Sequence, residues 1–232
     1  MGDGTVSLAI ETSSRRCAIA LGRGETLLAS TVLTRHRRHN VALMPGIARL
    51  CEAHAVEPDE LGEVYVSVGP GSFTGLRVAA ATVKMLALVH TVKVAAVPTL
   101  DVLAQNVPDG FDHALVCLNQ KRETVWGGLY TRYGDRMVPV GEAGVATMGE
   151  LLGAAERPIA VVGESLPDGD WLAEGVLVLA SEFAAPRAEV VWRLGRAAGV
   201  RGEYVEAGSL EPLYAREPEA VTLWNARRGG GG

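Results

Sequence analysis

The chain has 232 residues, 48% of them hydrophobic and 21% charged, which is enough to bury a core as one large domain or two lobes and excludes a disordered chain. A net charge of −5 excludes nucleic-acid binding over the whole surface, since neutralising phosphates requires clustered cations, but it leaves a local basic patch open. The three cysteines lie far apart and charges interrupt every long apolar stretch, so we expect a cytoplasmic protein with neither a disulfide framework nor a membrane span.

The first hundred residues have the pattern of five strands and two helices. Alternating apolar and small residues predict strands at 6–10, 17–21, 27–33, 64–68 and 92–97. Helical periodicity covers about 40–54 and 73–90. Asn40 suits the N-cap of the first helix, and Pro45 is expected to delay or bend it because proline removes a backbone donor.

The second half begins with the same succession of strands and turns. Strands are predicted at 114–118, 125–130, 137–140, 159–163 and 176–179, and helices at 100–107 and 188–198. Alternating strands and helices indicate an α/β fold. A meander of three strands opening each half predicts a duplicated, two-lobed fold, of which the actin-like ATPase (ribonuclease H-like) fold is the best-known case. We expect lobes at 1–100 and 101–226, and a disordered glycine-rich tail at 227–232.

The string GPGSFTGLR at 69–77 lies between a strand and a helix and allows two interpretations. It could bind an anion through backbone amides at a helix N-terminus, or it could be a strand-to-helix corner. Its glycine spacing matches neither the P-loop nor the dinucleotide fingerprint, which favours the corner. In that interpretation Pro70 and Gly71 form the turn, Ser72 or Thr74 caps the helix, and Gly75 permits close packing.

The first turn of each meander is where an actin-like ATPase would hold metal and phosphates. The first turn here has Glu11, Thr12 and Ser13 but no glycine, and the second has Asn119, Gln120 and Lys121 but no acid. One acid of two supplies few oxygen ligands for a metal-bound triphosphate, so ATP hydrolysis by this chain alone is not expected. We expect a vestigial nucleotide or anion loop made of Glu11, Thr12, Ser13, Gly71, Ser72 and Thr74, and we predict no catalytic residue.

The histidines do not indicate a metalloprotease. His36 and His39 lie in the basic run 35–39, without an H-E-x-x-H motif and with arginines that would repel a cation. We therefore predict no metal site. The run is expected to be a solvated loop, with a patch that meets tRNA or an acidic partner as the alternative.

The glycine loop also resembles a known family. GPGSFTGLR, with the Glu-Thr-Ser turn before it, resembles the TsaB (YeaZ) family of subunits for tRNA threonylcarbamoyladenosine formation. The segment 38–45 and the closing string PLYAR at 212–216 resemble further family motifs. The chain departs from the family at Glu11, where an aspartate is usual, and at 119–121, where Asp-Ala-Arg is usual.

The resemblance implies a noncatalytic scaffold and activator that pairs with a catalytic TsaD-type subunit through the two helices of the first lobe. It also implies a TsaE-type ATPase in the same complex, indirect contact with tRNA, and no cofactor held by this chain alone, with ATP or ADP allowed at the interface of the complex. A homodimer is expected when the partner is absent. The expected interface residues are His39, Leu43, Met44, Ile47, Leu76, Ala80, Val83 and Ala87. The alternative function is an ATPase or small-molecule kinase of the same fold.

Overall fold

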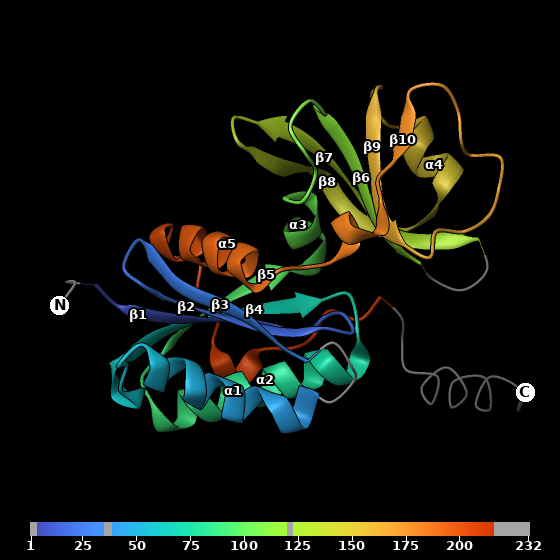
Figure 1. The fold of residues 1–232 in the computed structure, drawn as a ribbon. Coiled ribbons are helices and arrows are strands. Elements are labelled where there is room, and N and C mark those ends of the chain that lie inside the picture. The colour runs from blue at the N-terminus through green and yellow to red at the C-terminus, as the bar shows by residue number, and fades with distance from the viewer. Residues whose placement is uncertain (1–3, 35–38, 120–122, 216–232) are drawn as a thin grey trace, which may run out of the picture.

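Two five-stranded mixed sheets form the frame of the protein (Figure 1). The computed structural model describes residues 4–34, 39–119 and 123–215. The expected tail at 227–232 lies outside these residues.

The first sheet has the strand order β3-β2-β1-β4-β5. Its strands are β1 (Val6–Glu11), β2 (Cys17–Arg23), β3 (Thr26–Thr34), β4 (Leu61–Gly69) and β5 (Lys93–Pro98). Strands β1 to β3 form the antiparallel meander, while β4 runs parallel to β1 and β5 runs parallel to β4. Because parallel neighbours need a crossover connection, the chain inserts α1 (His39–Ala53) before β4 and α2 (Phe73–Val89) before β5. Pro45 lies inside α1, which begins at His39 nonetheless.

The second sheet repeats this arrangement with the order β10-β9-β6-β7-β8. Its strands are β6 (His113–Asn119), β7 (Thr124–Tyr133), β8 (Arg136–Thr147), β9 (Ile159–Glu164) and β10 (Val176–Val178). Again the first three strands are antiparallel and the last two are parallel additions. The predicted two-lobed, duplicated actin-like fold is therefore confirmed.

A short helix, α4 (Met148–Gly153), was not predicted from the sequence. It has only six residues, and two of them are Gly149 and Gly153. The helix is therefore too short for helical periodicity to be detected in the sequence. A capping box does mark its start, since Thr147 and Glu150 bond each other's backbone amides. That signal could have located the helix.

Helix α5 (Ala188–Val200) corrects the expected division into lobes 1–100 and 101–226. It packs on the first sheet, on the face opposite α1 and α2 (Figure 1). Trp192 Nε1 donates to Ser7 Oγ at 2.8 Å, and the first sheet also accepts bonds from Val205 and Leu213. Residues 188–215 thus belong to the first lobe. The sequence did not predict this, because helical periodicity shows that a helix has an apolar face but does not show which sheet that face covers.

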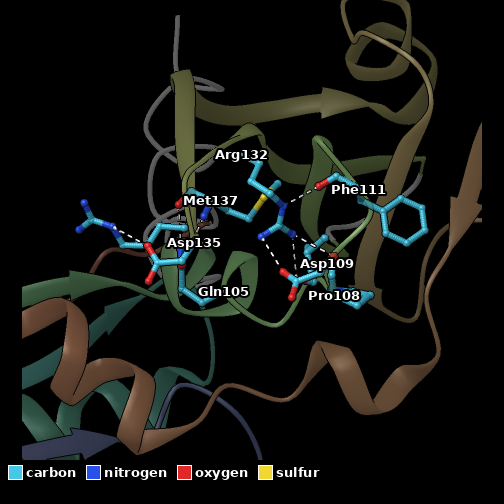
Figure 2. A network of polar contacts seen from close by, with 9 residues as sticks. Gln105, Pro108, Asp109, Phe111, Arg132, Asp135 and Met137 are labelled. Atoms are coloured by element: carbon cyan, nitrogen blue, oxygen red, sulfur yellow. Dashed lines mark hydrogen bonds and ion pairs between the residues drawn. The ribbon is translucent and has the colours of Figure 1, made fainter.

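Helix α3 (Thr99–Ala104) connects the lobes, and a polar network holds the loop after it against the second sheet (Figure 2). Arg132 Nε donates to the Phe111 carbonyl at 2.9 Å, and its Nη2 donates to Pro108 O at 2.9 Å. The same guanidinium forms an ion pair with Asp109 at 3.4 Å. Three short 3-10 helices, Pro58–Glu60, Ser181–Ala184 and Ala207–Ser209, complete the elements described. None of the helices described combines the length and apolar character needed to cross a membrane.

Candidate functional site

Two hydrogen bonds join the first turn to the glycine loop. Ser72 N donates to the Ser13 carbonyl at 2.6 Å, and Thr12 Oγ1 donates to the Gly75 carbonyl at 2.9 Å. Ser72 is the N-cap of α2, and its Oγ accepts from Gly75 N at 3.3 Å. The capping serine of the corner interpretation is therefore confirmed.

Two glycines of the loop are needed for this contact. A Cβ on Gly71 would lie 2.2 Å from the Ser13 carbonyl oxygen, and one on Gly75 would lie 1.9 Å from the Thr12 carbonyl oxygen. Both obstacles are backbone atoms, which cannot swing aside as the end of a side chain can. The small size of Gly71 and Gly75 thus serves close packing within the chain, as expected of a strand-to-helix corner.

The Glu11 carboxyl belongs to the same turn and is fully buried. Its Oε1 accepts from Ser13 N at 2.6 Å and from Ser13 Oγ at 2.5 Å, while Oε2 has no hydrogen-bond partner among the residues described. Burial raises the pKa of Glu11 above its ordinary value, and the bonds from Ser13 oppose this only partly. The environment therefore favours the neutral acid, which is a poor metal ligand.

A cleft of about 810 Å³ separates the two lobes next to this corner. Its first-lobe wall includes Arg15 and Thr74, and its second-lobe wall includes Leu118 and Glu164. Of the predicted vestigial loop, Ser13, Gly71, Ser72 and Thr74 line the cleft. The structure thus brings the six predicted residues together, but Glu11 and Thr12 are buried and do not line the cleft.

Tyr214 joins the closing PLYAR string to the glycine loop, which the sequence analysis missed. Its ring lies 5.0 Å from that of Phe73, and its hydroxyl accepts from Arg77 Nε at 3.1 Å. The Arg77 guanidinium also stacks on the Phe73 ring at 3.8 Å. One feature of the sequence could have predicted this contact. The glycine loop and the PLYAR string both carry the family resemblance, which suggests that they lie close together.

Most of the expected interface residues are inside the first lobe. Five of them are buried: Leu43, Ile47, Ala80 and Val83 in the core cluster of the lobe, and Leu76. Met44 is exposed, Ala87 is half-buried, and the side chain of His39 lies outside the residues described. These five buried residues are therefore not accessible to a partner, because one apolar face of each helix must cover the chain's own sheet.

The outward face of the same helices carries a different set of residues. On α2 it is a stripe at three- and four-residue spacing, formed by Phe73, Arg77, Ala81, Met85 and Leu88. Met85 is 45% exposed and Leu88 is 87% exposed. Met44 and Ala48 are exposed on α1, which contacts α2. We call these seven residues the outer helix face.

The described part of the chain contains no group of three or more His, Cys, Asp or Glu side chains placed to hold a metal. The basic run 35–39 lies outside the described residues, apart from the backbone of His39 at the start of α1.

Comparison with known proteins gives a consistent family assignment. The family model "TsaD: tRNA N6-adenosine threonylcarbamoyltransferase" matches residues 26–191. The chain is 30% identical over 226 residues to the tRNA threonylcarbamoyladenosine biosynthesis protein TsaB of Bacillus subtilis, covering 94% of this chain and 96% of that protein. The TsaB of Escherichia coli is 25% identical over 219 residues, covering 90% and 94%.

Two solved structures agree with this assignment. A protein similar to peptidase YeaZ from Pseudomonas aeruginosa is 27% identical with a TM-score of 0.76, over 91% of this chain and all of that one. YeaZ from Pseudomonas aeruginosa is 26% identical with a TM-score of 0.72, over 90% of this chain and 99% of that one. Matched along nearly its whole length in sequence and in fold, the chain belongs to the TsaB (YeaZ) family.

Proposed function

We propose that this protein takes part in forming threonylcarbamoyladenosine in tRNA as a noncatalytic scaffold and activator that pairs with a TsaD-type catalytic subunit. The observation that carries the proposal is the outer helix face, which leaves Met85 and Leu88 exposed on a helix whose other side is buried in the first lobe. Exposed apolar side chains in a contiguous group are typical of a protein interface. The proposal thus moves the interface from the core residues to the outward positions beside them.

The state of Glu11 supports the noncatalytic part of the proposal. A carboxyl that is buried and bonded to Ser13 cannot reach into the cleft without breaking those bonds. Its raised pKa favours the uncharged form, whereas Mg²⁺ bound to phosphates requires anionic oxygen ligands.

The interface is tested by placing a charge on the outer helix face. Leu88→Glu and Met85→Glu should each weaken binding to a TsaD-type subunit at least tenfold, because a charge buried without a partner in an interface costs several kcal/mol. Binding is measured by titration calorimetry, and modified adenosine in tRNA is measured in the reconstituted system. Val145→Glu, at a 55% exposed position on β8 of the second lobe, is the matched control and should bind normally.

Normal binding and normal modification by both helix variants would rule out this surface as the interface. The same surface would pair two copies of the chain when no partner is present, so the helix variants should also lower any self-association measured by sedimentation. We further propose that a TsaE-type ATPase joins the complex, that contact with tRNA is indirect, and that ATP or ADP binds where subunits meet.

The second candidate is an ATPase or small-molecule kinase of the actin-like fold, and the 810 Å³ cleft between the lobes favours it. Purified chain alone should hydrolyse ATP at no more than a trace rate if it is a scaffold. A clear rate that Glu11→Ala abolishes would instead support the enzyme.

A further inference from the structure

The chain crosses between the lobes twice, and the two crossings lie against each other. The first crossing runs from β5 through α3 to the loop at 105–107, and the second runs from the 3-10 helix at 181–184 to the start of α5. Leu103 of the first crossing and Ala184 of the second both line the cleft. Both crossings therefore border the cleft, and any change in the angle between the lobes must bend the chain at both of them.

Helix α3 is buried by both lobes at once. Val102 packs in the cluster that contains Tyr65 and Trp192 between the first sheet and α5. Leu100 and Leu103 pack in the core of the second lobe with Val116 and Tyr130. A helix held in two cores resists rotation, because turning it toward one lobe would remove apolar side chains from the other.

Polar contacts anchor the first crossing to the second lobe. Tyr130 Oη donates to Asp101 Oδ1 at 2.7 Å, and Gln105 Nε2 donates to the Met137 carbonyl at 2.8 Å (Figure 2 shows the Gln105 contact). Both contacts join α3, or the residue that follows it, to strands of the second sheet.

Asn106 is the residue that ties the two crossings together. Its Nδ2 donates to the Phe183 carbonyl at 2.8 Å and to the Ala185 carbonyl at 3.0 Å. Both acceptors lie just before α5, which packs on the first lobe, but Phe183 and Ala184 themselves pack against the core of the second lobe. One side-chain amide thus fixes the second crossing beside the first at its second-lobe end, and only residues 186 and 187 lie between the bonded Ala185 and the start of α5.

We propose that Asn106, by clasping the two crossings at their second-lobe ends, leaves too little free chain for the lobes to turn, so that they keep one relative orientation and the cleft keeps a fixed width. Asn106 is then a positioning residue for the cleft. This inference does not depend on the proposed function, because it concerns the geometry of the free chain. It means that a partner or small molecule meets a preformed cleft, unlike a kinase that closes its lobes around substrate.

The test measures the distance between the lobes in the full chain. Spin labels are placed at Thr26→Cys on the first lobe and Asp135→Cys on the second, both exposed positions, in a Cys51→Ser background that removes the half-buried thiol. Pulsed electron paramagnetic resonance should give a single narrow distance distribution for this reference protein. A broad or two-peaked distribution would overturn the proposal.

Asn106→Leu keeps a similar side-chain volume but removes both donors, and it should broaden the distribution or add a second peak. Gln105→Leu is the matched control, since it removes a neighbouring amide whose bonds do not join the crossings, and its distribution should stay narrow. A folded Asn106→Leu protein with the reference distribution would show that the amide is not the clasp. If Asn106→Leu does not unfold cooperatively, Asn106→Asp is used instead, because it replaces the donor with an oxygen that repels both carbonyls. A broadened distance distribution then supports the proposal, and the reference distribution overturns it.

Discussion

The two lobes share one strand order but differ in how their sheets are covered. In the first lobe, β1 and β2 are buried along nearly their whole length, because α1 and α2 lie on one face and α5 on the other. In the second lobe, β8 is mostly exposed and the helices against the sheet, α3 and α4, have six residues each. Repeated topology therefore does not imply equal packing.

This difference explains where the candidate surfaces are. The first lobe holds the buried Glu11 turn, the close contact at Gly75 and the outer helix face. The second lobe contributes the opposite wall of the cleft and a small core of its own. Variants placed in corresponding environments of the two lobes should therefore differ in the size and even the sign of their effect.

The largest effect is expected at Gly75. Gly75→Ala forces a methyl group against the Thr12 carbonyl and should lower the free energy of unfolding by about 3 kcal/mol or more, as strain in a packed site does. Gly144→Ala on β8 of the second lobe is the control, because no atom lies within 4 Å of the added carbon. Urea titration measures both, and equal stabilities would mean that the turn and the loop are not in close contact.

A smaller, pH-dependent effect is expected at Glu11. The raised pKa means that the folded protein keeps a proton that the unfolded chain releases above the ordinary value of 4.5. The contribution of Glu11 to the free energy of unfolding is therefore complete below pH 4.5 and is lost as the pH rises from there to the folded pKa. Glu11→Gln, which gives the first turn an amide as Asn119 does in the second, should remove this loss.

Thermal unfolding at several pH values checks the prediction for Glu11. From pH 5 upward, the wild type should lose up to about 1.4 kcal/mol per pH unit relative to Glu11→Gln until the folded pKa is reached. A difference between the two proteins that does not change with pH would show that Glu11 is ionised in the folded state.

The smallest effect, of opposite sign, is expected at Gly149 in α4. Gly149→Ala meets no atom within 4 Å, so it should stabilise the protein by about 0.5 to 1 kcal/mol through the higher helix propensity of alanine. A shift of the unfolding midpoint to higher urea concentration measures it. Destabilisation instead would show that the second lobe is packed as tightly here as the first lobe is at Gly75.

The sequence by itself determined the local elements and their repetition. Alternation of apolar residues located the strands within a few residues, since side chains on a strand point to opposite faces in turn. β8 was the exception, because Pro139 and Gly141 interrupt the pattern and the prediction ended at residue 140 while the strand continues to Thr147. Capping and glycine chemistry likewise located the corner at Ser72, because these preferences act over three or four residues.

Only the tertiary structure decided which surfaces meet. It placed α5 on the first lobe, buried Leu43 and Val83 while exposing Met85, and put Tyr214 against Phe73. It also brought Asn106 to the carbonyls of a segment far along the chain. These contacts join residues distant in sequence, so their free energy depends on the packing of whole sheets and helices, which no local pattern of residue types contains.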